Sequence, residues 1–159
     1  RWHMIGRLQR NKVSSVARWA DIVESIDRHE LIAPLAGAVE RFDRKPVQVL
    51  LQVSLDPMPD PGRGGIDPND VESLAEAVAG HEALHLAGVM AVAPHPDTGV
   101  NPRAAFDRLY EISALVRASW PNAREISAGM SSDLEAGVAA GATQVRIGGA
   151  ILGERPPVQ

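Results

Sequence analysis

Hydrophobic positions along this chain fall into short runs and into longer stretches where apolar residues recur at helical spacing. The short runs have the length of β-strands, and the longer stretches have one apolar face of an α-helix. The predicted strands cover residues 3–6, 22–26, 46–55, 84–94, 125–130 and 143–148. The predicted helices cover residues 12–20, 29–42, 67–79, 101–119 and 132–141. Strands and helices therefore alternate along the whole chain.

Three of the predicted helices carry start signals. Asp67 and Asn101 are each followed by proline, which suits the first helical turn, while Asp and Asn suit the cap before it. Ser132 is followed three residues later by Glu135, the spacing of a capping box. We therefore expect helices to begin at these positions.

The alternation of strands and helices is typical of βαβ units around a parallel sheet. The strand predicted over residues 46–55 is apolar over nearly its whole length, as expected when both faces of a sheet are covered. Two architectures fit this pattern, a doubly wound open sheet and a (β/α)8 barrel. We expect one domain over residues 1–159, because this length supports a single substantial core.

A loop rich in Pro, Gly and Asp, DPMPDPGRGGIDPND, follows the strand over residues 46–55. Its composition favours turns over any regular element. Asp56 and Asp60 lack the spacing of a calcium-binding loop. We expect a mobile surface loop that, in a barrel, lies on the ligand face because it follows a strand exit.

Composition and charge argue against several classes of protein. The net charge of −4, without a run of Lys and Arg, argues against nucleic-acid binding. The absence of cysteine excludes disulfides and Cys-based metal sites, and it suits a cytoplasmic protein. No apolar stretch approaches the ~20 residues of a membrane span. We expect no metal site at His81 and His85, and we expect His3 to be a hydrogen-bonded core histidine.

The last predicted strand, in TQVRIGGAIL, ends in features that suit an anion. In barrels, phosphate often binds at the loops after the last two strands. Gly148 and Gly149 allow close approach of the backbone and can direct N–H groups at a phosphate. Ser131 lies at the preceding strand exit, and Arg146 adds a permanent positive charge. Together these residues indicate a phosphate-bearing ligand.

These residues also have structural explanations, which stay open at this point. Glycine pairs are common in turns, so Gly148 and Gly149 could form a plain tight turn. Arg146 could pair with Asp133 or Glu135, or extend its charged head to the rim of the sheet. The combination is more specific than any single residue.

Five segments, in order along the whole chain, resemble the pyridoxal phosphate homeostasis protein family. They are WHMIGRLQRNK (2–12), ESIDR (24–28), VLLQVSL (49–55), LAGVMAVAP (86–94) and SAGMSSDLEAGVAAGATQVRIGGAILGER (127–155). The resemblance implies a barrel like the N-terminal domain of alanine racemases, with roughly the first two βα units missing before Arg1. It also implies pyridoxal 5′-phosphate (PLP) as the cofactor, at the carboxyl ends of the strands.

The same resemblance implies roles for individual residues. Ser131 and the backbone at Gly148 and Gly149 match family positions that hold the phosphate, and Arg146 matches the arginine facing the pyridine nitrogen. A permanently cationic guanidinium keeps that nitrogen unprotonated and weakens the ring as an electron sink, which suits a cofactor carrier. The family usually has Thr or Ser at the position of Gly149, so one hydrogen bond to phosphate is lost here.

The family's Schiff-base lysine lies on the first barrel strand, before the segment with which this sequence begins. The chain's only lysines are Lys12 and Lys45, and neither occupies that position. We therefore expect no catalytic residue in this chain. The expected function is PLP binding for intracellular PLP homeostasis, without catalysis, by a monomer or weak homodimer that binds neither nucleic acid nor membrane.

Two alternatives stay open. One is a PLP-dependent amino-acid racemase with the same barrel; such racemases take a tyrosine base from a second, β-rich domain. The only tyrosine here, Tyr110, lies inside a predicted helix, which counts against racemisation. The other alternative is a truncated remnant that does not bind PLP.

Overall fold

The structure is a computed structural model that describes residues 1–58, 60 and 62–153. Its strands are β1 (His3–Met4), β2 (Ile22–Ile26), β3 (Val47–Gln52), β4 (Leu84–Met90), β5 (Glu125–Met130) and β6 (Gln144–Arg146). Its α-helices are α1 (Val13–Val16), α2 (Ile32–Arg41), α3 (Val71–Ala79), α4 (Pro102–Ser119), α5 (Leu134–Ala139) and α6 (Gly149–Leu152). Its 3₁₀ turns are η1 (Arg10–Lys12), η2 (His29–Leu31), η3 (Pro68–Asp70) and η4 (Pro96–Thr98). Glu154 and Arg155, which end the longest resembling segment, lie outside the described residues.

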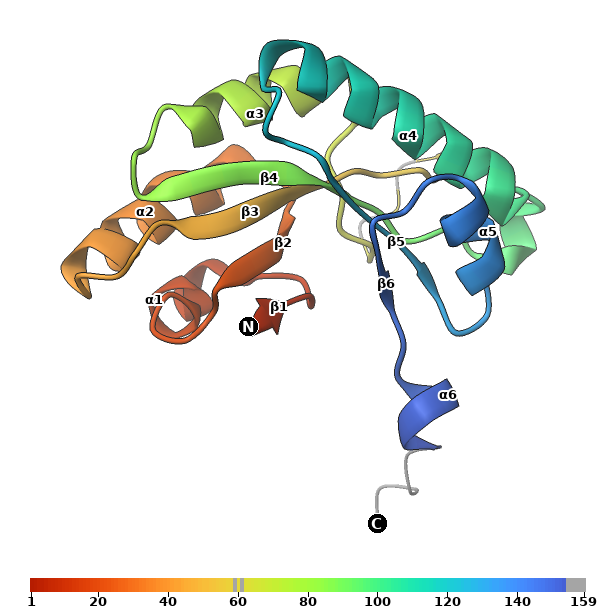
Figure 1. Cartoon of the computed structure of the whole chain (residues 1–159), viewed down its shortest axis with the longest axis horizontal. Coiled ribbons are helices and arrows are strands. Elements are labelled where there is room, and N and C mark those ends of the chain that lie inside the picture. The colour runs from red at the N-terminus through yellow and green to blue at the C-terminus, as the bar shows by residue number, and fades with distance from the viewer. Residues whose placement is uncertain (59, 61, 154–159) are drawn as a thin grey trace.

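The six strands form one parallel sheet in which each strand pairs with the next in sequence. The sheet is curled, and helices α1 to α5 lie around its convex side (Figure 1). This strand order is not that of a doubly wound sheet, in which the order reverses within the sheet. Sequential parallel strands in a curled sheet are instead the geometry of a (β/α) barrel wall. The predicted α/β class is confirmed, and the described residues form a six-stranded half-barrel.

Two predicted strands, β2 and β5, are correct residue for residue, and others are shorter than predicted. The strand predicted over residues 46–55 pairs only as far as Gln52, because its partner β4 ends opposite it at Met90. Val53 continues into a single bridge with Ile66 of the following loop. β1 and β6 are short and lie at the two edges of the sheet, where each has only one neighbour among the described strands.

Two of the three predicted helix caps are confirmed. The carboxylate of Asp67 accepts from the N–H of Asn69 at 2.8 Å, and the amide oxygen of Asn101 accepts from the N–H of Arg103 at 2.8 Å. The predicted cap at Ser132 is wrong, because that residue lies in the turn before α5 and the cap position is the next residue, Asp133.

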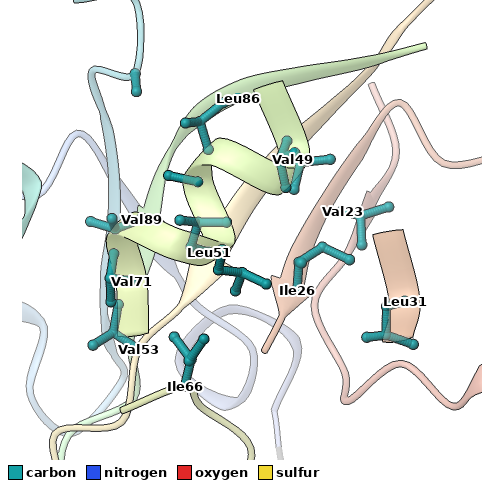
Figure 2. Close-up of a cluster of buried hydrophobic side chains, with 14 of the residues drawn as sticks. Val23, Ile26, Leu31, Val49, Leu51, Val53, Ile66, Val71, Leu86 and Val89 are labelled. Carbon is teal, nitrogen blue, oxygen red and sulfur yellow. The ribbon is translucent and has the colours of Figure 1, made fainter. Parts of the chain in front are cut away.

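The convex face of the sheet and the helices over it enclose the main hydrophobic core (Figure 2). Side chains of β3 alternate between the two faces: Val49 and Leu51 belong to this core, and Leu50 to a smaller cluster. The smaller cluster lies on the concave face because it holds the residues between those that face the helices. Its buried residues are Ile22, Leu50, Ala87 and Met90.

The alternation of convex-facing and concave-facing residues along β4 is interrupted at Gly88. Leu86 and Val89 both belong to the convex core although they are three positions apart, and the register with β3 shifts at this point. Such a shift is a β-bulge, which glycine often occupies. Gly88 has a φ of +157°, and a Cβ there would lie 1.9 Å from the carbonyl oxygen of Glu125. The close contact between β4 and β5 therefore requires glycine at this position.

Several hydrogen bonds anchor the described part of the loop after β3. Arg63 Nε donates to the carboxylate of Asp56 at 2.9 Å, and Arg63 Nη2 donates to the carbonyl of Ala93 at 2.7 Å. Ile66 is buried and bonds to the end of β3 through its backbone. These contacts fasten the described part of the loop to the ends of β3 and β4. Its prolines 59 and 61 lie outside the described residues.

Candidate functional site

The predicted cofactor-binding residues lie at the carboxyl ends of the neighbouring strands β5 and β6. Met130 pairs with Arg146 in the sheet, so the two strand exits are adjacent. Ser131 follows Met130 directly and is exposed. Gly148 and Gly149 follow Arg146 at the start of α6. The structure therefore brings the predicted serine, arginine and glycines to one edge of the sheet.

Two hydrogen bonds hold the side chain of Arg146. Its Nη1 donates to the hydroxyl of Ser127 at 2.6 Å, and its Nη2 donates to the carbonyl of Ala91 at 2.7 Å. Within the described residues it forms no ion pair with Asp133 or Glu135, so the predicted alternative of direct pairing is wrong. A guanidinium has five N–H groups, and these two bonds leave three available.

A polar chain continues from Arg146 across the interior of the curled sheet. The hydroxyl of Ser127 donates to Glu24 Oε2 at 2.6 Å, and Glu24 Oε1 lies 2.6 Å from His3 Nδ1. Ser127 and Glu24 are buried, with 0% and 2% of their surface exposed. We call His3, Glu24, Ser127 and Arg146 the concave polar chain. It joins β1 and β2 to β5 and β6, so it connects the two edges of the sheet.

Electrostatics at Arg146 reflect burial and two carboxylates. Burial lowers the pKa of Arg146 because it disfavours the charged guanidinium, and the charges of Glu24 and Asp133 act in the opposite direction. The carboxylate of Asp133 accepts a hydrogen bond from the N–H of Met130 at 2.5 Å, which fixes it beside the exit of β5. An arginine remains charged at neutral pH in such surroundings. The site therefore presents a permanent cation.

Open space lies beside the glycine pair. A Cβ placed on Gly148 or Gly149 would have no heavy atom within 4 Å. The pair begins a short helix and not a plain tight turn, because the N–H groups of Ile151 and Leu152 bond back to the carbonyl of Gly148. The first N–H groups of a helix have no partner inside it. Backbone donors at Gly149 and Ala150 therefore face no competing helical acceptor.

The two lysines lie where the sequence suggests. Lys45 is exposed and precedes β3, at the amino end of the sheet and away from the end that carries Arg146. Lys12 is exposed in η1, which follows β1.

Sequence reasoning missed Glu24 and Ser127 as parts of the site. Both lie within predicted strands, and nothing in their local sequence shows that they meet across 103 residues of chain. One signal was available for Glu24: a carboxylate in the middle of the apolar run IVESI needs a buried partner. His3 is hydrogen-bonded, as predicted, but it is half-buried at the edge strand β1 and is not a core residue.

Within the described ranges 1–58, 60 and 62–153, no His, Asp and Glu side chains gather in the groups of three that a metal ion needs. Over the same residues, no helix combines the length and the apolar character needed to cross a bilayer. The candidate site thus consists of Arg146, the hydroxyl of Ser131, the backbone N–H groups at Gly148 and Gly149, and the concave polar chain.

Known proteins resemble this chain over nearly its whole length. The model of the alanine racemase N-terminal domain matches residues 1–156. A pyridoxal phosphate homeostasis protein of Mycobacterium tuberculosis is 43% identical over 162 residues, covering 97% of this chain and 61% of the relative. A protein of the same name from Corynebacterium glutamicum is 37% identical, covering 98% of this chain and 71% of the relative. The chain thus spans about three fifths of the mycobacterial relative's length.

A solved structure agrees with this result. The structure of PipY of Synechococcus elongatus PCC7942 with PLP bound has a TM-score of 0.79 and 28% identity, covering 92% of this chain and 67% of PipY. The resemblance predicted from the five sequence segments is therefore confirmed. The chain belongs to the alanine racemase N-terminal domain family and, within it, to the pyridoxal phosphate homeostasis proteins.

Proposed function

We propose that this chain binds PLP at the carboxyl ends of β5 and β6, as part of a protein that maintains the intracellular PLP supply. The observation that carries the proposal is the geometry of Arg146. Ser127 and Ala91 hold its guanidinium while three N–H groups stay available at the strand ends. A fixed cation with unused donors suits a ligand with a basic ring nitrogen.

The neighbouring groups fit the other end of such a ligand. The hydroxyl of Ser131 and the backbone N–H groups at Gly148 and Gly149 would hold the phosphate, since all are neutral donors beside open space. Arg146 would face the pyridine nitrogen and keep it unprotonated. PLP, when bound, supplies an aldehyde and an electron-withdrawing ring, and an unprotonated ring withdraws electrons less strongly. This argues for a carrier without catalysis.

Two findings on related proteins support the proposal. Relatives that are 37–43% identical to this chain over 161–162 aligned residues carry the name pyridoxal phosphate homeostasis protein. PipY, which shares the fold, has a solved structure with PLP bound. In this proposal the role is buffering and delivery of PLP, with no catalytic residue in this chain.

The proposal extends to architecture and assembly. We propose a single domain over residues 1–159 that, in the complete protein, forms part of an eight-stranded barrel; the curled sheet and sequential strand order support this. We further propose a cytoplasmic protein that is a monomer or weak homodimer, with PLP as its small-molecule partner. Light scattering across a concentration series tests the assembly, and cell fractionation tests the location.

The experiment uses the protein encoded by the complete reading frame. PLP is titrated into it, and binding is measured by calorimetry and by the absorbance of the ligand. The wild type should bind PLP. Arg146→Gln should weaken binding by about tenfold, the loss of one charge-assisted bond, and shift the absorbance of the bound ligand. Arg124→Gln is the control, since Arg124 is exposed, directly precedes β5 at the amino end of the sheet, and donates to the carbonyl of Pro121. It should bind PLP as the wild type does.

Failure of the wild type to bind PLP would overturn the proposal and favour a non-binding remnant. An unchanged spectrum in Arg146→Gln would remove the ring-nitrogen role of this residue. Incubation with L-alanine or D-alanine tests the racemase alternative, because turnover would abolish the optical rotation of the solution. Retained rotation is the result expected for a carrier.

A further inference from the structure

The buried carboxylate of Glu24 has no role in the proposed contacts with PLP. It lies in the middle of β2, is 2% exposed, and forms no ion pair with Lys or Arg among the described residues. Burying a carboxylate is costly unless hydrogen bonds satisfy it. Its two oxygens are satisfied by His3 and Ser127, each at 2.6 Å. The surrounding residues therefore satisfy both oxygens of the buried Glu24 carboxylate.

The direction of the hydrogen bonds connects Glu24 to the ligand site. A serine hydroxyl has one hydrogen, and an ionised carboxylate can only accept. The hydroxyl of Ser127 therefore gives its hydrogen to Glu24, and its lone pair is left to accept from Arg146 Nη1. Without the acceptor at Glu24, the hydroxyl is free to turn its hydrogen elsewhere, and the lone pair no longer has a fixed direction.

Arg146 has only one other hydrogen-bond partner in the described chain, the carbonyl of Ala91. A single bond leaves a guanidinium able to rotate about that contact, whereas two bonds on different nitrogens fix its plane. The bond to Ser127 is the second of the two. The charge of Glu24 also favours the charged form of Arg146.

We propose that Glu24 is a positioning residue, which acts through Ser127 to fix the plane of Arg146 and so sets how strongly the site recognises a basic ring nitrogen. The inference rests on the proposed function, since it assigns Arg146 to that nitrogen. Glu24 touches no ligand in this scheme. It holds in place the group that does, from the opposite side of the curled sheet.

The test compares two ligands on the protein encoded by the complete reading frame. One is PLP, and the other is its benzene analogue, in which C–H replaces the ring nitrogen and the phosphate and aldehyde are kept. The variants are Glu24→Gln, which removes the charge, and Ser127→Ala, which removes the link. The control is Ser25→Ala on the same strand, because Ser25 is buried and its hydroxyl has no hydrogen-bond partner among the described residues.

Glu24→Gln and Ser127→Ala should each weaken PLP binding by about tenfold, the usual effect of disturbing one buried charged hydrogen bond. Both should bind the benzene analogue as the wild type does, because the phosphate contacts lie elsewhere. Ser25→Ala should match the wild type with both ligands. Ser127→Ala keeps the test decisive if Glu24→Gln fails to fold, since it deletes only a hydroxyl.

The outcomes separate this inference from the proposed function. If the wild type does not bind PLP, the proposed function itself fails. If the wild type binds PLP and the two variants keep its preference for PLP over the analogue, Glu24 has no positioning role. Equal weakening of both ligands also overturns the inference, because it indicates general damage to the site.

Discussion

The two faces of the sheet are built from alternate residues of the same strands, yet they carry different chemistry. The convex face meets the helices with Val, Leu and Ile, which form one continuous core (Figure 2). In the described part of the chain, the apolar cluster on the concave face has four buried residues, and the concave polar chain crosses this face. Aliphatic contacts are non-directional, whereas each bond of the polar chain fixes an angle. The convex face therefore stabilises the fold, and the concave face specifies the site.

The largest change in stability is expected at the β-bulge of β4, at Gly88. Gly88→Ala places a Cβ 1.9 Å from the backbone oxygen of Glu125, which no side-chain movement can relieve. We expect a loss of more than about 4 kcal/mol in the free energy of unfolding, in the range of the most severe single substitutions. Circular dichroism during urea unfolding measures it. A cooperative transition at the wild-type midpoint would contradict the account of the bulge.

Leu50 and Leu51 compare the two faces directly, since they are adjacent in β3 and both are almost fully buried. Leu51→Ala, in the convex core, should cost about 3–4 kcal/mol, and Leu50→Ala, in the small concave cluster, about 2 kcal/mol. The difference arises because a small cluster on an open face can collapse into the space left behind. Equal losses in urea unfolding would show that the two faces contribute alike to stability.

The next effect is smaller and is a gain in stability, in the helices that cover the convex face. Gly37 lies inside α2, is exposed, and would place a Cβ with no heavy atom within 4 Å. Gly37→Ala should stabilise the fold by about 0.5–1 kcal/mol, because it restricts the unfolded chain without a clash. PLP affinity should stay at the wild-type value. A loss of stability in thermal unfolding would indicate that α2 is strained at this point.

The smallest effect concerns Asp21, which fastens the edge strand that carries His3. A hydrogen bond from the N–H of Trp2 and the charge of Arg44 lower the pKa of Asp21, although burial opposes them. A lowered pKa in the folded state adds stability above the unfolded pKa of about 3.9 and loses it as the pH falls through the folded value. Asp21→Asn should therefore lower the melting temperature by about 1–2 °C at pH 7. The difference should vanish in strong acid, and a constant difference at all pH values would exclude the charge as its cause.

Much of the convex face could be predicted from the sequence, because periodicity reports which residues face a helix. The bounds of β2 and β5 and the caps at Asp67 and Asn101 are local properties of the chain, and they were predicted correctly. The cap at Ser132 was not, because Asp133 occupies the cap position and uses its carboxylate to bond the exit of β5.

The concave face could be predicted only in part. Arg146 and the glycines stand out because a charge and a flexible pair end an apolar strand. The contacts that hold Arg146 come from Ser127 and Glu24, which alternation assigns to a buried face without saying what they meet. The interrupted alternation at Gly88 is equally hidden, because the residues directly before and after Gly88 in the sequence are all apolar. The contacts of Arg146 and the bulge at Gly88 both depend on how the sheet curves, and the sequence of a single strand does not show this curvature.

The distance along the chain between Glu24 and Ser127 has a consequence for the order of assembly. Contacts between residues far apart in sequence form late, because a long loop must close before they are gained. Their bond spans 103 residues, and Arg146 joins from still nearer the carboxyl end. A nascent chain can bury the apolar side of its first strands long before this bond exists. The proposed ligand site would thus form only after β5 and β6 have joined the sheet, later than the apolar contacts of β2 and β3.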